Sequence, residues 1–374
     1  MKGLYIHIPF CAHICNYCDF AKKIKISQTQ EDNYIKKIKE DLLKNKEHFS
    51  DIDTIYIGGG TPNALSYNAL NDLLQFIYNL DINYKEYSIE LNPELLDLKT
   101  VRLLKNYGIN RVSLGVQTFN ERLLKLLGRK HTNDDVYQAI ELLKSEGINN
   151  INIDLMFGIF TETIDEFKND IKEFLDLQIP HLSCYSLILE ENTMFNRLYK
   201  ESDLDEDLTY SMMEYLIKTL KENNYIHYEI SNFAKENHES MHNIKYWSKD
   251  EYIGIGMGAT SYINHKRITN SSYINKYLKD EDYYIEDLTL FDEKKEFVIL
   301  GLRKLKGISL NTYKEKYKTD FYDDFNITKL LNNDLIIVED DTIRLSEKGL
   351  YLGNVVFEEF LWKKLMLKIL YFLR

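Results

Sequence analysis

Three of the chain's four cysteines lie within eight positions, at the spacing Cys11-x3-Cys15-x2-Cys18. A mostly apolar run, residues 4–8, precedes them, and Pro9 ends that run because proline cannot donate to a strand ladder. The stretch therefore predicts a strand followed by a cysteine loop. Three thiolates at this spacing can bind three corners of one iron–sulfur cube, which leaves the fourth iron open to a substrate or cofactor.

Two other uses of clustered cysteines fit this sequence less well. A structural zinc site takes four ligands, and no second cysteine pair exists here, although His13 lies within the loop. A disulfide framework requires an even number of cysteines in a secreted chain, and three clustered cysteines after an N-terminus without a signal peptide do not match it. The remaining cysteine, Cys184, stands in an apolar strand and is expected to be a buried thiol.

The segment Tyr5-Ile-His-Ile-Pro-Phe-Cys11 resembles the radical S-adenosylmethionine (SAM) superfamily, and within it the oxygen-independent coproporphyrinogen III oxidase group. That resemblance implies a [4Fe–4S] cluster whose open iron binds the amino and carboxylate groups of SAM. A later segment, His242-Asn-Ile-Lys-Tyr-Trp247, resembles the heme-chaperone branch of this group, called HemW. The resemblance covers about residues 3–360.

Strand-like runs alternate with helical patterns through the first half of the chain, at residues 4–8, 54–57, 87–91, 111–116, 150–156 and 181–187. Such alternation builds a parallel sheet with right-handed crossovers. The fold class is therefore α/β, and six units are similar to the partial (β/α)6 barrel of the radical SAM family. The first helix is expected to begin at a cap formed by Thr29 and Asp32.

Three domains are expected: the barrel at 1–225, a heme-related middle region at 226–290, and a winged-helix-like end domain at 291–374. The end domain is predicted from a hairpin, in which the apolar run 335–338 and the run 343–345 flank an Asp340-Asp341 turn. The last residues, 361–374, contain four basic residues and no acid, with apolar residues at helical spacing. This tail fits either a docked terminal helix or a helix on an anionic membrane surface.

Polar and glycine residues follow the predicted strands at the ends where a parallel α/β fold carries its site. They are the cysteine loop, the glycine run 58–60, Glu90, Gln117 and Asp154. Glycines allow a ligand to approach the backbone closely, carboxylates accept from ribose hydroxyls or an ammonium group, and an amide both donates and accepts. A tight turn is the alternative for the glycines, and a polar partner is expected for a buried Asp154.

The resemblance assigns roles to single residues. It implies cluster ligation by Cys11, Cys15 and Cys18, and SAM contacts by Gly59, Gly60, Thr61, Glu90, Gln117, Arg129 and Asp154. It also implies that Tyr5 and Tyr17 bind beside the cluster. Arg129 is a fixed cation that can fork onto a carboxylate, or else a residue on a helix surface. His242 is the expected heme iron ligand, and a histidine hydrogen-bonded in a structured loop is the alternative.

Three positions depart from the family pattern. Phe20 stands where the decarboxylating oxidase carries a fourth cysteine. Gly158-Ile-Phe-Thr-Glu-Thr163 replaces the usual Gly-Leu-Pro-Gly-Gln-Thr, which puts the turn after the fifth strand in doubt. Thr260 stands where a histidine is common, so one potential metal ligand is missing.

A formal net charge of −12 argues against a general nucleic-acid binder, whose affinity depends on neutralising phosphates. Unpaired cysteines and the absence of an export signal favour the cytoplasm. Two functions remain open. The first is a heme chaperone that passes heme to an acceptor protein, for which a membrane respiratory enzyme is a candidate. The second is a coproporphyrinogen III oxidase, an enzyme that uses a 5′-deoxyadenosyl radical and an electron donor. Phe20 and the His242–Trp247 segment favour the first.

Overall fold

The computed structural model describes residues 1–25 and 27–361. Its central feature is a run of six parallel strands: β1 (Lys2–Ile8), β4 (Ile52–Gly59), β5 (Glu86–Leu91), β6 (Arg111–Gln117), β7 (Asn150–Phe157) and β8 (His181–Ser186). They neighbour one another in chain order. These strands coincide with the six predicted runs, so the expected barrel architecture is confirmed.

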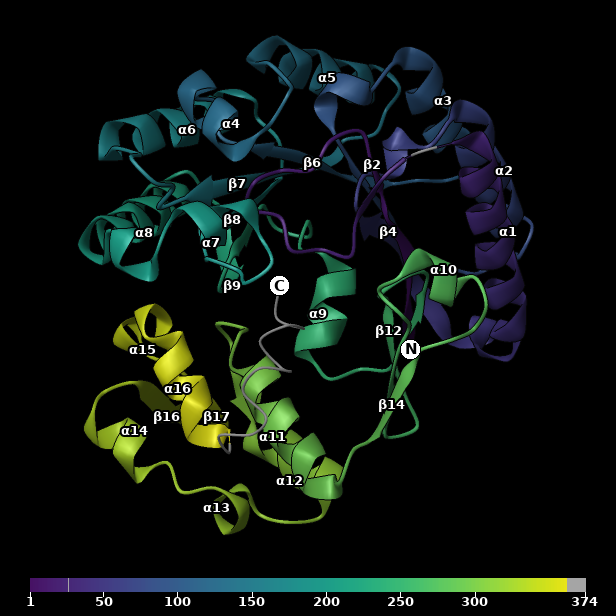
Figure 1. The fold of residues 1–374 in the computed structure, drawn as a ribbon. Coiled ribbons are helices and arrows are strands. Elements are labelled where there is room, and N and C mark those ends of the chain that lie inside the picture. Colours follow the sequence, from purple (N-terminus) through teal and green to yellow (C-terminus); the bar gives the residue numbers. More distant parts are fainter. Residues whose placement is uncertain (26, 362–374) are drawn as a thin grey trace.

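Helices cover the outer face of this sheet, in the arc that Figure 1 shows. They are α1 (Gln28–Lys44), α2 (Tyr67–Tyr78), α3 (Leu98–Asn106), α4 (Glu121–Leu127), α5 (Asn133–Ser145), α6 (Ile164–Asp176) and α8 (Glu206–Glu222). The short α7 (Met194–Leu198) lies inside this arc, where the N–H of Phe195 donates to the Asn16 carbonyl at 3.0 Å. Each long helix buries one apolar stripe, as α5 does with Val136, Ile140 and Leu143. Short 3-10 turns occur at Lys46–Asp51, Pro62–Ala64, Pro93–Leu95 and Glu201–Asp203.

The start of α1 corrects one expectation. The N-cap is Ser27, whose Oγ accepts from the N–H of Gln30 at 3.3 Å, and Thr29 lies inside the helix. Serine and threonine are both good caps, so residue type alone does not decide between neighbouring positions. The prediction of Thr29 as the cap was therefore wrong by one half-turn of helix.

The middle region extends the same sheet at both edges. Beside β1 lie β11 (Tyr252–Ile255), which is parallel, and then β12 (Thr260–Ile263), β13 (Lys266–Thr269) and β14 (Tyr284–Asp287), which are antiparallel. Beside β8 lie β10 (Asn232–Ala234) and β9 (Ile226–Glu229). Two helices, α9 (Met241–Trp247) and α10 (Ile274–Tyr277), belong to this region. Its strands thus continue the barrel sheet, and the boundary at 225 stays a prediction.

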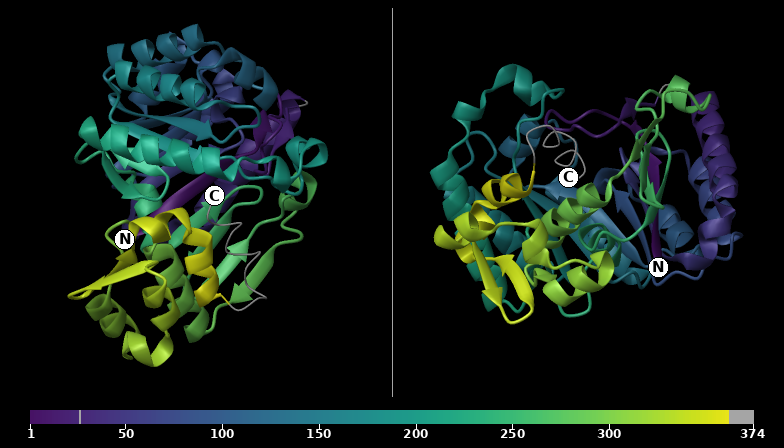
Figure 2. Two further views of the ribbon diagram at one scale, coloured as in Figure 1. Left: turned by 90° about the vertical axis from the view of Figure 1, so that its left-hand side faces the viewer. Right: turned by 90° about the horizontal axis from the view of Figure 1, so that it is seen from below.

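The C-terminal unit has its own hydrophobic core, distinct from that of the barrel. It contains α11 (Leu290–Gly301), β15 (Ile308–Ser309), α12 (Leu310–Tyr317), α13 (Phe321–Asp324), α14 (Thr328–Asn332), β16 (Ile336–Glu339), β17 (Thr342–Leu345), α15 (Glu347–Tyr351) and α16 (Gly353–Phe360). Its three strands pair in the order β15-β17-β16, and the β16–β17 hairpin matches its prediction. Figure 2 shows this unit beside the barrel, away from α3, α5 and α6.

Within residues 1–25 and 27–361, no helix is long and apolar enough to cross a membrane. The predicted amphipathic tail, apart from Leu361, lies outside the described residues.

Candidate functional site

A cavity of about 2130 Å³ opens within the barrel and reaches the C-terminal unit. All of the residues that the sequence analysis assigned to a site line this cavity: Tyr5, Cys11, Cys15, Tyr17, Cys18, Gly59, Gly60, Thr61, Glu90, Gln117, Arg129, Asp154 and His242. Pockets for single small ligands usually measure roughly 300–1,000 Å³, so this cavity has room for more than one ligand.

The cysteine loop is fixed at both ends. The short strands β2 (Phe10–Cys11) and β3 (Lys23–Ile24) pair and close it, and the N–H of Lys23 donates to the carbonyl of Pro9 at 2.7 Å. In between, Asn16 joins the loop to α4, because its N–H and its side-chain amide donate to the carbonyls of residues 127 and 126 at 2.9 and 2.8 Å. These backbone and Asn16 hydrogen bonds order the loop without involving the cysteine thiols.

The three loop cysteines and Cys184 are all free thiols. Cys184 is buried in β8, as expected. Burial raises the pKa of Cys18 to about 11, and burial also raises that of Cys11, whose sulfur accepts from the Thr61 hydroxyl at 3.6 Å. Binding of iron by these thiols would therefore release protons.

The glycine run holds the cysteine loop against β4. The N–H groups of Gly59, Gly60 and Thr61 donate to the Glu90 carboxylate, to the Ile8 carbonyl and to the Phe10 carbonyl, at 2.9, 2.8 and 2.9 Å. A Cβ at Gly60 would lie 2.8 Å from the Pro9 backbone, so only glycine permits this approach. These three N–H groups therefore already have acceptors within the protein.

Glu90 and Asp154 place two partly buried carboxylates on the cavity wall. Glu90 accepts from the Tyr56 hydroxyl at 2.8 Å, and Asp154 accepts from Ser113 at 3.1 Å and Asn152 at 2.8 Å. The polar partner expected for Asp154 is therefore present. Burial raises the pKa of Glu90 to about 7 and that of Asp154 above its ordinary value. A cationic ligand would offset the cost of keeping both ionised.

Gln117 and Arg129 stand on the same wall, near the cysteines. Gln117 ends β6 in the left-handed region, with φ of 71°, a strained conformation for a non-glycine residue. Arg129 is buried, and its guanidinium donates to the Gly115 carbonyl and to Asn92 Oδ1 at 3.1 Å, with Cys15 Sγ at 3.7 Å. Arg129 is thus a fixed cation beside the cysteine loop and does not lie on a helix surface.

His242 lies in α9, beside Gly3 and Thr54 near the starts of β1 and β4, whereas the cysteine loop follows the end of β1. It is buried, with Nδ1 at 2.9 Å from the Thr54 hydroxyl and Nε2 at 2.8 Å from the Tyr246 hydroxyl. Burial lowers its pKa to about 3, so the ring is neutral at pH 7. Both nitrogens already have partners, and ligation of iron by His242 would require one hydrogen bond to be exchanged.

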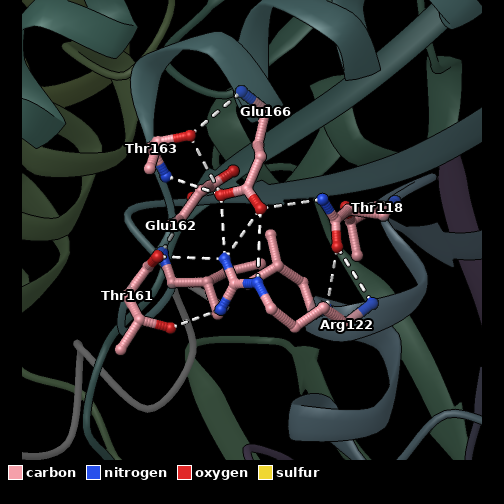
Figure 3. A network of polar contacts seen from close by, with 9 residues as sticks. Thr118, Arg122, Thr161, Glu162, Thr163 and Glu166 are labelled. Atoms are coloured by element: carbon pink, nitrogen blue, oxygen red, sulfur yellow. Dashed lines mark hydrogen bonds and ion pairs between the residues drawn. The ribbon is translucent and has the colours of Figure 1, made fainter.

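The turn after β7 keeps its shape through contacts of its own. Thr161 adopts a left-handed φ of 65°, at the position where the family pattern has glycine. Arg122 of α4 donates to the Thr161 carbonyl at 3.0 Å and to both oxygens of Glu166 at 2.8 Å, as Figure 3 shows. Glu162, in place of the usual glutamine, is buried and accepts from the N–H of Ile159 at 2.9 Å.

Residues 5–174 match the model of the radical SAM superfamily, and residues 288–352 match the HemN C-terminal domain. Similar proteins named heme chaperone HemW occur in Lactococcus lactis and Bacillus subtilis. They are 41% and 36% identical to this chain. Each alignment covers 96% of this chain, and it covers 97% of the Lactococcus protein and 99% of the Bacillus protein.

The chain belongs to the HemW family. Among solved structures, the coproporphyrinogen III oxidase HemN from Escherichia coli has a TM-score of 0.84 at 22% identity, covering 96% of this chain and 90% of its own. That likeness concerns the fold alone. The family membership rests on the HemW sequences, and the radical SAM match confirms the superfamily that the cysteine loop indicated.

As a member of the radical SAM superfamily, the protein uses a [4Fe–4S] cluster and SAM, and HemW proteins bind heme. The residues present fit the first two groups. Each cysteine of a four-iron cluster bonds a different iron, and the three loop cysteines all line the cavity. Within residues 1–25 and 27–361, no three His, Cys, Asp or Glu side chains converge closely enough to hold a single metal ion, which agrees with thiols that each meet a separate iron. Beside them, Glu90 and Asp154 suit the cationic part of SAM and Arg129 suits its carboxylate. When bound, the cluster would supply an electron to SAM.

Two residues that position the site were not found from the sequence. Asn16 clamps the cysteine loop to α4, and Tyr56 joins the two halves of the cavity, since its hydroxyl donates to Glu90 while its ring stacks on His242 at 5.2 Å. Asn16 gave no separate signal because it lies between two cysteines that dominate the pattern. Tyr56 looked like an ordinary apolar strand residue, and only the register of β4 against β5 reveals its partner.

Proposed function

We propose that this protein binds heme and transfers it to an acceptor protein, and that it keeps a [4Fe–4S] cluster and SAM in the same cavity. The observation that carries the proposal is the full-length similarity to HemW proteins together with a cavity lined by the cysteine loop at one end and by α9 at the other. Cys11, Cys15 and Cys18 are the proposed cluster ligands, and the wall from Gly59 to Asp154 is the proposed SAM site.

The heme is proposed to bind at α9. Tyr246 and Trp247 offer flat apolar surface of the kind that packs on a porphyrin face. His242 remains the proposed iron ligand, with exchange of its Tyr246 hydrogen bond as the step that frees Nε2. The half-buried His238, whose Nδ1 is 2.9 Å from the Glu236 carbonyl, is the second imidazole close enough in sequence to serve.

The finer partners are proposals as well. A membrane respiratory enzyme is the proposed acceptor, and a reductant is required if SAM is cleaved. Peripheral membrane contact is proposed for residues 361–374, whose sequence combines four basic residues with apolar residues at helical spacing. Cosedimentation of the full chain and a 1–360 truncation with anionic and with neutral vesicles tests that contact, and equal cosedimentation of both proteins would contradict it.

The principal experiment measures heme binding and release. Anaerobically reconstituted protein is titrated with heme and followed by its Soret absorbance, and the heme-loaded protein is then mixed with an apo-form heme enzyme. We expect saturable binding and faster activation of the enzyme than free heme produces. His242→Ala is expected to change the spectrum or weaken binding, with His238→Ala as the matched control. An unchanged His242→Ala titration would exclude His242 as the ligand.

A second experiment separates the proposal from oxidative decarboxylation. Phe20 occupies the position of the oxidase's extra cysteine. We therefore expect no conversion of coproporphyrinogen III to protoporphyrinogen IX, with HemN as the positive control. Complementation of a strain without coproporphyrinogen oxidases would contradict this expectation.

A further inference from the structure

Arg303, just after α11, is a largely buried cation whose side chain donates no hydrogen bond to another described residue. Its side chain is 11% exposed, and its Nε–H has no acceptor within residues 1–25 and 27–361. The carboxylate beside it is that of Glu229, whose Oε2 is 3.9 Å from Nη2, beyond hydrogen-bonding distance. A guanidinium removed from water without hydrogen bonds is costly, so this position favours an additional anionic partner.

Trp247 supplies a second unused donor at the same place. The guanidinium carbon of Arg303 lies 4.4 Å from the centroid of the indole ring. Trp247 is 8% exposed, and its Nε1–H has no acceptor in the described part of the chain. Both residues line the large cavity. Arg303 and Trp247 therefore place a charged and a neutral N–H donor side by side at the wall of a space that can admit a ligand, although Nε of Arg303 and Nε1 of Trp247 are themselves covered in this structure.

Glu229 does not fully neutralise this cation. The carboxylate is completely buried, and its other oxygen, Oε1, accepts from the N–H of Ser231 at 3.0 Å and from the Asn232 amide. Burial raises the pKa of Glu229, so its negative charge is itself disfavoured in this position. A guanidinium has five N–H donors, and the single distant carboxylate leaves most of them available.

We propose that Arg303 and Trp247 together bind a carboxylate side chain of the porphyrin, an assignment that rests on the proposed heme binding. Heme carries two propionates at one edge of its ring. Trp247 stands five residues after His242 on α9, which is about 7.5 Å along the helix axis. One macrocycle can span that distance, so the same helix can contact the ring while its carboxylate reaches the Arg303 guanidinium.

The test compares heme with heme dimethyl ester, in which both propionates are neutral. The reconstituted full chain and Arg303→Met, Arg303→Lys and Trp247→Phe are titrated with each compound. Wild type should bind heme more tightly than the ester. Arg303→Met should weaken heme binding by roughly 10-fold to 100-fold and leave the ester unchanged, because hydrogen bonds between charged groups are the strong ones. Arg303→Lys should retain part of the preference for heme over the ester. Trp247→Phe should lose less of that preference than Arg303→Met does.

The matched control is Arg102→Met. Arg102 is an exposed arginine that pairs with Glu146 on the barrel surface, so this variant should bind both compounds as wild type does. Iron content reports that each variant is folded around its cluster. If wild type binds heme and ester equally, the carboxylate site is refuted while heme binding stands. An Arg303→Met protein that loses both compounds equally would also refute it, since the residue would then be structural. If wild type binds neither compound, the proposed function itself fails.

Discussion

Glu162→Gln restores the glutamine of the family pattern and should make the protein more stable at neutral and alkaline pH. Glu162 is buried, and its Oε1 has no hydrogen-bond partner in the described chain. Burial, with the nearby negative charge of Asp170, raises the pKa of Glu162 from 4.5 to about 8. The folded state thus prefers the protonated acid. Its contribution to stability is complete below about pH 4.5 and is lost as the pH rises through 8.

The size of the effect follows from those two values. At about 1.4 kcal/mol per pH unit, a rise from 4.5 to about 8 corresponds to a cost of about 5 kcal/mol when the group is fully ionised. Between pH 5 and pH 8 the expected loss is about 3 kcal/mol, because ionisation in the fold is only half complete at pH 8. A glutamine amide can still accept from Ile159 and adds no charge beside Asp170. For a chain of this length, about 3 kcal/mol corresponds to a change in Tm of roughly 4 °C.

The assay is thermal unfolding of the cluster-free protein between pH 5 and pH 8.5, followed by circular dichroism. Wild type and Glu162→Gln should have similar Tm values near pH 5 and separate progressively above pH 6, with the variant higher. Glu166→Gln is the opposite control. Although burial alone would raise the pKa of Glu166, hydrogen bonds from Arg122 and the start of α6 hold it below the ordinary value. That variant should lose stability at neutral pH. If the Tm of wild type and the Tm of Glu162→Gln change with pH in the same way, the reasoning is refuted.

Four further predictions concern the site and its supports. Cys15→Ala should lose the cluster, measured as iron per chain after anaerobic reconstitution, whereas Cys184→Ala, a core thiol, should retain about four irons. Asp154→Ala should weaken SAM binding about tenfold or more without loss of iron, and equal affinity by calorimetry would exclude it from the site. Because burial raises the pKa of Glu90 to about 7, SAM affinity should increase from pH 6 to pH 8 in wild type, and Glu90→Gln should reduce that increase. Thr161→Gly should raise stability by about 1 kcal/mol by relieving the left-handed backbone of a β-branched residue, and a lower Tm would show that the Arg122 contact matters more.

The strands and the residues at their ends were predictable because two independent regularities agree. Buried parallel strands read as short apolar runs, and proline or glycine follows several of them, at Pro9, Gly58 and Pro93. Once six such runs are aligned, the polar residues that follow them must share one end of the sheet. The structure places all of them on one cavity for that reason.

The remaining features depend on contacts between segments that are distant in sequence. The donors of the glycine run are taken by Glu90, Ile8 and Phe10, a fact that no spacing within residues 58–61 conveys. The edge of the sheet also depends on a distant partner. Strand β11 pairs with β1, about 250 residues earlier in the chain, although the sequence of β11 is typical of a glycine-rich loop. Local patterns identify what a segment can form, whereas its partner is decided by the assembled fold.

Helix α9 illustrates the same division within one short motif. The sequence presents His242, Tyr246 and Trp247 as a single unit, but their side chains belong to different parts of the structure. His242 contacts Thr54 and Tyr56 of the barrel, whereas Trp247 belongs to the core of the C-terminal unit and stacks with Arg303. A ligand on α9 would therefore contact both units at once. Its binding would be sensitive to how they are held together, and the Tyr56 ring extends that dependence to Glu90 and the proposed SAM site.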